Sequence, residues 1–411
     1  MVETPFKYVV VGGGLAGAAA VAGIRELDPK GSVLLIGSEE DLPYERPPLT
    51  KQLWSGKKKV LEIFVRSEEE YRRLGVTVIL GRTVIAVDAE AKKIRTDGGE
   101  VYGYSKLLLA TGAAPRRLAI PGGDLPDIFY YRTLGDYRRL RPKAVPGSSA
   151  VVIGGGFIGS ELAAALQNQG VAVTMLFPEP VLCSRIFPDS LGRAVTEFYR
   201  SKGITVITKD KPKLISRLDG RLAVTTEGGL ALAADIVVAG IGVAPATGLA
   251  EGAGLTVANG IVVNEMLRTS QPDIYAAGDN ALFPSRLLGT PMRLEHWDNS
   301  VSQGKAAGRN MAGASEPFAY QPYFYSDLFD FGYEAVGLID SRLGTVEDWQ
   351  QENRTGVVYY LAAGRVRGVM CCNVWDKMEA ARSLIGAGEP RTPQTLRGAI
   401  AIKEANHEPG K

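Results

Sequence analysis

The stretch GGGLAG, residues 12–17, follows an apolar run at Lys7–Val11 and precedes a helical pattern that reaches about Leu27. A second apolar strand is expected at Ser32–Ile36. This order of strand, glycine turn, helix and strand predicts a dinucleotide-binding unit. In such a unit the first glycine permits the tight turn, the second lets the backbone approach a pyrophosphate, and the third lets helix and strand pack closely. The three glycines are Gly12, Gly14 and Gly17.

The same unit occurs a second time along the chain. Ala150–Ile153 predicts a strand, GGGFIG at residues 154–159 the turn, Ser160–Gln169 the helix and Val171–Phe177 the next strand. A single G-x-G-x-x-G is weak evidence, but two complete units make coincidence improbable. The second set of glycines is Gly154, Gly156 and Gly159. We therefore expect an α/β protein with two Rossmann-like dinucleotide-binding domains.

An acidic residue follows the second strand of each unit, Glu39 in the first and Glu179 in the second. A carboxylate at this place accepts a hydrogen bond from a ribose 2′-hydroxyl and repels a 2′-phosphate. Glu179 therefore favours NADH over NADPH, although Arg185 lies not far downstream.

Composition limits the classes of partner and compartment. The 47 basic and 45 acidic residues leave a net charge of +2, which gives no reason to expect nucleic acid or an anionic membrane as a partner. The uncharged stretch Tyr8–Ile24 lacks the basic leader of a signal peptide, so we expect a cytoplasmic protein. The 3 cysteines form no Cys-x-x-Cys and have no histidine nearby, so no metal site is predicted.

The segment LPYERPPLTKQL, residues 42–53, is too stiff and too charged for a plain linker. Pro47 and Pro48 fix φ and reduce the entropy lost when the loop is ordered. We interpret the segment as a rigid wall that places Arg46 and Lys51 against a ligand.

Further stretches carry a resemblance to a known family. LLLATGAAP at Leu107–Pro115 and DIYAAGDN at Asp273–Asn280, with the doubled glycine motif, resemble FAD-dependent, NAD(P)H-linked oxidoreductases with two dinucleotide domains. The non-disulfide branch is most similar, first apoptosis-inducing factor and then the ferredoxin reductases of oxygenase systems. Segments similar to the former are Thr174–Pro180, Leu294–Ala314, Tyr325–Asp340 and Gly356–Ile385. Without a mitochondrial leader or the long C-terminal insertion, the chain resembles a compact bacterial relative.

The resemblance implies that FAD occupies the first unit. The residues then expected to hold it are Gly12, Gly14, Gly17, Glu39, Arg46, Thr111, Gly112 and Asp279. Lys51 is expected near the flavin N5, paired with Glu161 of the nicotinamide-binding domain. From the residues alone, a solvated lysine and a helix-start glutamate would be the simpler interpretation.

Several aromatic residues are implied to lie around the flavin and nicotinamide. Phe157 would cover the flavin face where nicotinamide stacks, with helix packing as the alternative. His296 would be a positioning or proton-handling residue, beside Trp297. Tyr325 stands where the relative has a stacking aromatic residue, although a core tyrosine is an alternative.

The expected domains are a discontinuous FAD-binding domain at 1–121 and 248–315, a NAD-binding domain at 122–247, and a smaller C-terminal α/β interface domain at 316–411. The tail from about Gly386, which ends beyond His407 and Pro409, is a candidate for poor order.

The predicted function is an FAD-dependent NADH oxidoreductase that passes electrons to a quinone, a ferredoxin or oxygen. The alternatives are a ferredoxin or rubredoxin reductase of an oxygenase system, or an NADH sensor that dimerises on reduction. A homodimer is possible in either case.

Overall fold

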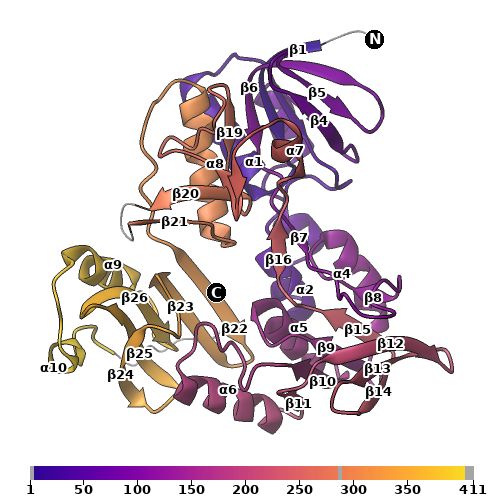
Figure 1. Ribbon diagram of the computed structural model, residues 1–411, viewed down its shortest axis with the longest axis vertical. Helices are drawn as coiled ribbons and strands as arrows, with labels where there is room; N and C mark the ends of the chain where they lie inside the picture. Colours follow the sequence, from indigo (N-terminus) through magenta and orange to yellow (C-terminus); the bar gives the residue numbers. More distant parts are fainter. Residues whose placement is uncertain (1–3, 286–288, 403–411) are drawn as a thin grey trace. The chain divides into compact units, whose positions relative to one another are not determined.

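The computed structural model describes residues 4–285 and 289–402 and divides into two units (Figure 1). The first unit comprises residues 1–45, 59–114 and 244–322, and the second comprises residues 46–58, 115–243 and 323–411. The segment that contains Lys51 therefore belongs to the second unit. The expected division into three domains stays a prediction, as do its boundaries. His407 and Pro409 of the expected tail lie outside the described residues.

The elements of the first unit are β1 (Thr4–Val11), α1 (Leu15–Leu27), β2 (Val33–Ile36), η2 (Val60–Ile63), α3 (Glu68–Arg73), β3 (Val76–Ile79), β4 (Val84–Asp88), β5 (Lys93–Thr96), β6 (Val101–Leu109), α7 (Gly248–Gly252), β17 (Val257–Ala258), β18 (Gly260–Val262), β19 (Ile274–Ala276), β20 (Ala281–Ser285), β21 (Thr290–Met292) and α8 (Trp297–Met311). The strands β7 (Ala113–Pro115) and β16 (Val243–Pro245) lie where the chain passes from one unit to the other.

The main sheet of the first unit has the strand order β3-β2-β1-β6-β5-β4, with β19 beside β6. The strands from β3 to β6 and β19 are parallel, whereas β4, β5 and β6 pair as antiparallel neighbours. Every residue of β2 is buried, as expected for a parallel strand covered on both faces. The order reverses between β1 and β6, and ligands of open α/β sheets bind at the carboxyl ends of strands at such a point.

Helices α1 and α8 lie side by side in the first unit (Figure 1). Small residues permit this approach, because a Cβ on Gly308 would lie 2.1 Å from the carbonyl oxygen of Ala20. The two helices are also joined by ion pairs, because Glu26 of α1 lies 2.8 Å from Lys305 and 2.7 Å from Arg309 of α8. Because α1 follows the glycine turn, its packing on α8 brings the first residues of both helices to one side of the unit.

The elements of the second unit are η1 (Pro47–Leu49), α2 (Gln52–Ser55), β8 (Ile128–Phe129), α4 (Leu134–Leu140), η3 (Arg141–Lys143), β9 (Ser149–Ile153), α5 (Phe157–Asn168), β10 (Ala172–Phe177), α6 (Asp189–Ser201), β11 (Thr205–Thr208), β12 (Pro212–Leu218), β13 (Arg221–Thr226), β14 (Ala231–Ala234), β15 (Ile236–Ala239), β22 (Tyr323–Leu328), β23 (Phe331–Gly337), β24 (Gly344–Gln351), β25 (Thr355–Ala362), β26 (Arg365–Cys372), α9 (Met378–Ala387) and α10 (Pro393–Leu396).

A parallel sheet in the order β11-β10-β9-β15-β8 repeats the plan of the first unit, and β12-β13-β14 form an antiparallel sheet. The expected α/β class with two dinucleotide-binding sheets is confirmed. Helix α5 begins at Phe157, earlier than the expected Ser160, because the last residues of the glycine turn already have helical hydrogen bonding.

The C-terminal sheet is antiparallel, in the order β22-β23-β26-β25-β24, and α9 packs on β23 and β26. A hairpin between Ala362 and Arg365 joins β25 to β26. The tail is packed as far as Ile400, which is buried and whose N–H donates to the hydroxyl of Tyr359 at 3.3 Å.

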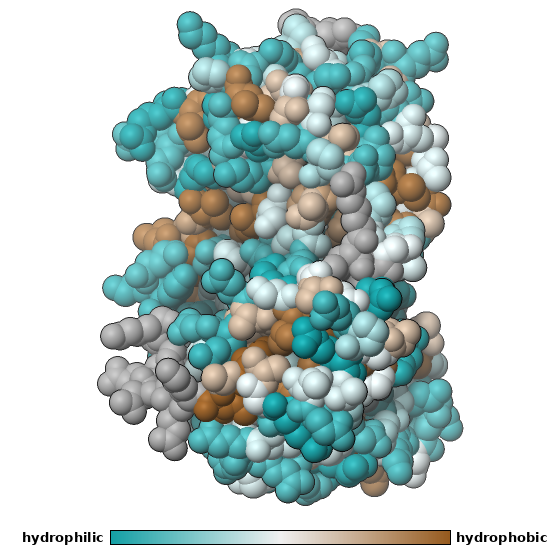
Figure 2. Space-filling model, turned by 90° about the vertical axis from the view of Figure 1, so that its left-hand side faces the viewer, coloured by the Kyte–Doolittle hydropathy of each residue, from teal (hydrophilic) through white to brown (hydrophobic). Residues whose placement is uncertain are grey.

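The surface agrees with the composition. On the face drawn in Figure 2, hydrophilic residues predominate and hydrophobic residues form small groups among them. Within the part of the chain that the structure describes, every helix is too short or too polar to cross a membrane.

Candidate functional site

The first glycine turn lies at the carboxyl ends of adjacent strands. Val11 of β1 is in register with Leu109 of β6, which is in register with Ala276 of β19. Gly12 has φ +127°, and a Cβ there would lie 2.0 Å from the carbonyl oxygen of Ala110. A side chain at this position is thus excluded by backbone conformation and by space.

The other two glycines of this turn differ from each other in their surroundings. A Cβ on Gly17 would lie 2.1 Å from the carbonyl oxygen of Gly12, so this glycine is required for packing. Gly14 caps α1 in an extended conformation, with φ −99°, and a Cβ there would meet no heavy atom of the described residues within 4 Å. The fold therefore does not require a glycine at position 14, and the backbone there is open to the approach of a ligand.

The second unit reproduces this geometry. Gly154 has φ +116°, and a Cβ there would lie 2.4 Å from the carbonyl oxygen of Gly240, while a Cβ on Gly159 would lie 2.1 Å from that of Gly154. Gly156 again has open space, with no heavy atom of the described residues within 4 Å of a Cβ. Both turns thus fit a pyrophosphate that approaches the backbone at the helix N-terminus.

Asp279 is held beside the first glycine turn. Gly278 packs on Ala16, because a Cβ on Gly278 would lie 3.1 Å from the Cβ of Ala16. The N–H of Gly278 donates to Oε1 of Gln303 at 2.7 Å. Ser300 donates to Oδ1 of Asp279 at 3.2 Å. Asp279 is 7% exposed, so its carboxylate is buried on a turn that Gln303 and Ser300 hold by hydrogen bonds.

Asn280 connects the turn of Asp279 to Thr111, another residue expected to contact the flavin. Its amide donates to the carbonyl oxygen of Leu109 at 3.1 Å and to the hydroxyl of Thr111 at 2.9 Å. The Thr111 hydroxyl donates to Ala246 O at 2.7 Å, and Gly112 has φ +69°. Oδ1 of Asn280 and Nε2 of Gln303 are buried and have no hydrogen-bond partner among the described residues. Buried polar atoms normally have hydrogen-bond partners, so these two atoms fit a site for a polar cofactor such as FAD.

Glu39 and Glu179 follow β2 and β10 at corresponding positions. The hydroxyl of Tyr44 donates to Oε2 of Glu39 at 2.5 Å, which orients that carboxylate. The backbone oxygen of Glu179 accepts from Lys209 N–H at 3.3 Å. Each residue thus follows the second strand of its unit, and the contact of its carboxylate with a ribose stays a prediction.

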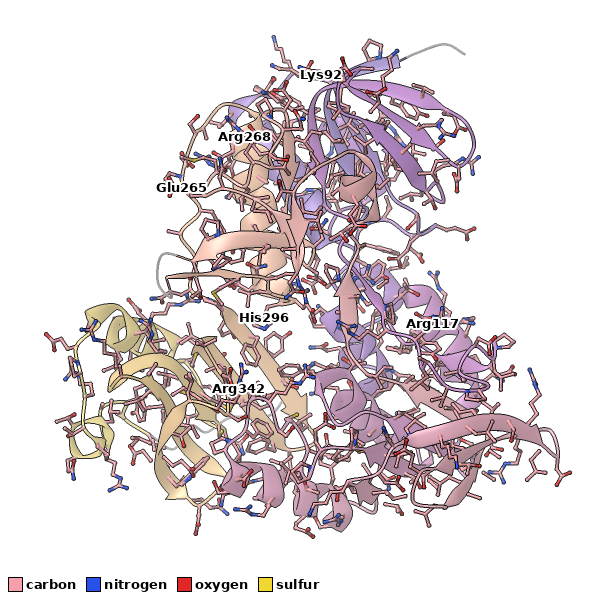
Figure 3. The ribbon with its side chains drawn as sticks, viewed as in Figure 1. Lys92, Arg117, Glu265, Arg268, His296 and Arg342 are labelled. Carbon is pink, nitrogen blue, oxygen red and sulfur yellow. The ribbon has the colours of Figure 1, made fainter. Side chains whose placement is uncertain are left out.

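Trp297 is the first residue of helix α8 and His296, labelled in Figure 3, is its N-cap. Trp297 is 36% exposed. His296 keeps part of its surface accessible, yet burial of its ring lowers its pKa to about 4, against the opposing effect of Asp279. The imidazole is therefore neutral at pH 7 and can donate or accept a hydrogen bond, but it is not a cation there.

We expect His296 to make the protein less stable in acid. Its folded pKa of about 4 lies below the ordinary value of 6.5, so the unfolded chain binds the proton more readily between these values. The stability is present above pH 6.5 and is lost as the pH falls, by about 2 kcal/mol at pH 5. Thermal unfolding at pH 7.5 and pH 5 should show a smaller acid-induced fall for His296→Gln than for the unsubstituted protein. Equal falls in the two proteins would contradict this assignment.

Lys51 and Glu161 form the ion pair expected from the family resemblance. Nζ of Lys51 lies against Oε1 of Glu161, and their side chains are 9% and 7% exposed. The same ammonium lies 5.6 Å from the ring centroid of Tyr325. A buried lysine is thus held by a carboxylate from α5 and an aromatic ring from β22.

The neighbours of this pair are placed by local packing. Arg46 donates to the carbonyl oxygen of Arg132 at 2.8 Å, and Trp54 donates to that of Leu49 at 2.7 Å. Phe157 is 36% exposed and its ring meets that of Phe324 edge-on, with centroids 5.4 Å apart. The contact of Arg46 with phosphates and the cover of the flavin by Phe157 stay predictions.

The cysteines are all buried: Cys183, Cys371 and Cys372. Burial raises the pKa of Cys183 to about 12, and that of Cys371 to about 12. Because the thiolate is the reactive form, these thiols are inert near neutral pH.

Sequence reasoning missed the residues that hold the two key carboxylates. Thr50 donates to Oε2 of Glu161 at 2.6 Å and Ser326 donates to Oε1 at 2.5 Å, from 111 and 165 residues away. Ser300 and Gln303 hold the turn of Asp279. A lone serine, threonine or glutamine carries no signal of such a role, except that Thr50 adjoins Lys51.

Comparison with known proteins is consistent with this geometry. Residues 6–304 match the family described as pyridine nucleotide-disulphide oxidoreductase, and residues 307–355 match the C-terminal region of apoptosis-inducing factor. The chain is 35% identical to apoptosis-inducing factor 1, mitochondrial, of Dictyostelium discoideum, over 92% of this chain and 78% of that protein. It is 34% identical to the ferredoxin–NAD(+) reductase component of the anthranilate 1,2-dioxygenase system of Burkholderia cepacia, over 95% of this chain and 96% of that protein. A solved structure of a covalent putidaredoxin reductase–putidaredoxin complex matches with a TM-score of 0.90 and 30% identity, over 95% of both chains.

Proposed function

Because this chain belongs to the pyridine nucleotide-disulphide oxidoreductase family and is an FAD-dependent NADH oxidoreductase, we propose that its electron acceptor is a ferredoxin. The observation that carries the proposal is the similarity to a ferredoxin–NAD(+) reductase component over 95% of this chain and 96% of that protein. The match to a reductase solved with its putidaredoxin partner supports a protein acceptor. The 3 buried cysteines favour direct transfer from the flavin, without a redox-active sulfur pair.

The residues divide into those for FAD and those for NADH. When bound, FAD accepts hydride from the nicotinamide and passes the electrons on to the acceptor. The proposed FAD residues are Gly12, Gly14, Gly17, Glu39, Arg46, Thr111, Gly112, Asp279, His296 and Trp297. The proposed NADH residues are Gly154, Gly156, Phe157, Gly159, Glu179 and Tyr325. Open space at Gly14 and Gly156 supports close approach of each pyrophosphate to the backbone.

The Lys51–Glu161 pair is proposed to act on the flavin ring. Glu161 holds the ammonium of Lys51 in place, and the ammonium supplies positive charge where the ring gains electron density. His296, neutral at pH 7, positions a reactant or handles a proton by hydrogen bonding.

An anaerobic titration tests this function. The purified protein should show a flavin spectrum that NADH bleaches more readily than NADPH. The reduced protein is then mixed with a purified [2Fe–2S] ferredoxin, with a soluble quinone and with oxygen. Fastest reoxidation by the ferredoxin supports the proposal, and reoxidation by the quinone alone contradicts it.

A second candidate is an NADH sensor of the apoptosis-inducing-factor type, favoured by the match of residues 307–355 to that protein's C-terminal region. Its signature would be dimerisation on addition of NADH, with slow reoxidation by every acceptor. Light scattering of the reduced and oxidised protein distinguishes the two candidates.

Glu179→Gln is expected to weaken the preference for NADH. The change removes the negative charge that repels a 2′-phosphate and replaces a charged hydrogen-bond acceptor with a neutral one. The ratio of kcat/KM for NADH to that for NADPH should fall about 10- to 100-fold, the effect of one charged hydrogen bond. Glu197→Gln, an exposed change on α6, is the matched control and should leave the ratio unchanged. An unchanged ratio in Glu179→Gln would show that the preference for NADH comes from other residues.

A further inference from the structure

The carboxylate of Glu161 is held from more than one side. Oε2 accepts from the Thr50 hydroxyl at 2.6 Å, while Oε1 accepts from the Ser326 hydroxyl at 2.5 Å and contacts Nζ of Lys51. Glu161 is 6% exposed, Thr50 6% and Ser326 0%. These donors come from the end of η1 and from β22, two segments far apart in the sequence.

Each hydroxyl is placed by rigid local structure. Thr50 follows the prolines of η1, and its N–H donates to Pro47 O at 3.3 Å. Ser326 lies in β22 and is in register with Tyr333 of β23. Both hydroxyls are buried, and a buried hydroxyl needs an acceptor. Glu161 accepts from each of them, and its Oε2 lies nearer the Thr50 hydroxyl, at 2.6 Å, than the alternative acceptor Pro47 O, at 3.3 Å.

Two side chains on one face of helix α5 contact two side chains on one face of strand β22. Phe157 and Glu161 are four residues apart and therefore share a helix face, while Phe324 and Ser326 are two apart and share a strand face. The rings of Phe157 and Phe324 meet edge-on, and the side chains of Glu161 and Ser326 are hydrogen-bonded. The C-terminal sheet thus supports α5 at two points one helical turn apart.

We propose that Thr50 and Ser326 are positioning residues that orient the Glu161 carboxylate and, through it, the ammonium of Lys51. A lysine side chain is long and its ammonium rotates freely, so one ion pair fixes its place poorly. Two hydroxyls, one on each carboxylate oxygen, fix the plane of the carboxylate and leave one direction for the ammonium. The inference rests on the proposed role of Lys51 at the flavin.

The variant Thr50→Val keeps the shape of the side chain and removes its hydroxyl, whereas Thr50→Ser keeps the hydroxyl. In the FAD-loaded protein, Thr50→Val should slow flavin reduction by NADH about five- to tenfold, the effect of one hydrogen bond, with little change in KM. Thr50→Ser should restore most of the rate. Ser326→Ala should act like Thr50→Val, and Ser383→Ala, an exposed serine of α9 in the same unit, is the control.

Two readouts do not depend on turnover. The midpoint potential of the bound flavin should become more negative in Thr50→Val and Ser326→Ala, because the positive charge is less well placed. Labelling of Lys51 by acetic anhydride, followed by peptide mass spectrometry, should increase in both variants, because its side chain is only 9% exposed in the intact arrangement.

The background Glu161→Ala completes the test. If both hydroxyls act through this carboxylate, Thr50→Val should have almost no further effect there. An equal effect with and without Glu161, or a rate, potential and labelling in Thr50→Val like those of the unsubstituted protein, overturns the inference. Failure of the proposed role of Lys51 is distinguishable, because then Lys51→Met alone would leave flavin reduction unchanged. Failure of the proposed acceptor is also distinguishable, because it changes reoxidation by ferredoxin and leaves flavin reduction by NADH unchanged.

Discussion

A protein that carries Gly14→Ala is expected to fold normally and to purify without bound FAD. The backbone at Gly14 is extended, and a Cβ there meets no heavy atom of the described residues within 4 Å, so alanine causes no steric conflict within the chain. Alanine is a poorer helix cap than glycine, which costs at most about 1 kcal/mol. The new methyl group would occupy the space where the pyrophosphate approaches, so the Kd for FAD should rise about 100-fold.

Gly156→Ala is the matched variant in the second turn. It should purify yellow, with an unchanged flavin spectrum, because its open space lies in the other dinucleotide unit. The Kd for NAD⁺ should rise by about 100-fold for the same reason as for FAD at the first turn. Loss of FAD in Gly156→Ala together with retention of FAD in Gly14→Ala would reverse the proposed assignment of cofactors to the two units, and either result alone would contradict it.

The third glycines distinguish a ligand effect from a folding effect. A Cβ on Gly17 or on Gly159 would lie 2.1 Å from a backbone oxygen of its own turn. Gly17→Ala and Gly159→Ala should therefore lower the thermal unfolding temperature of the protein even without cofactors, whereas Gly14→Ala should not. Scanning fluorimetry of the apoproteins measures this difference.

The sequence predicted these turns well because their signal is local. Gly12, Gly14 and Gly17 act within six residues, and the strand and helix on either side show their own periodicity. The succession of strand, glycine turn, helix and strand, present twice, predicted an α/β protein with two Rossmann-like domains, and the structure has a parallel sheet around β1, β2 and β6 and another around β9, β10 and β15.

The features that the sequence did not predict depend on contacts between residues far apart in the chain, and a single sequence does not reveal such contacts. The interpretation of the stretch from Leu42 to Leu53 as a rigid wall stays a prediction, and the boundary between the two units falls inside it, after Glu45. Ser326 could not be linked to Glu161, because a serine in a strand pattern has the same appearance whether it faces solvent or a buried carboxylate. Helix α5 begins at Phe157, three residues before the predicted Ser160, because glycine in the turn obscures the pattern that marks the start of a helix.

The double variant Lys51→Met/Glu161→Gln is expected to be stable and yet slow. Lys51→Met alone leaves the Glu161 carboxylate buried without its cation, and breaking a buried pair from one side costs about 3–5 kcal/mol. Its unfolding temperature should therefore fall by several degrees. Replacing both partners by neutral residues of similar size removes this penalty, so the double variant should recover most of the stability.

Catalysis should not recover in the same way. Both variants lack the ammonium proposed to act on the flavin, so flavin reduction by NADH should remain about 100-fold slower, the typical effect of losing one electrostatic stabiliser. Lys213→Met, a change at an exposed lysine of β12, controls for the loss of a charge in the same unit. Stopped-flow absorbance measures the rate, and thermal unfolding measures the stability. If the rate returned together with the stability in the double variant, the Lys51–Glu161 pair would be structural, and the positive charge near the flavin would have to come from another residue.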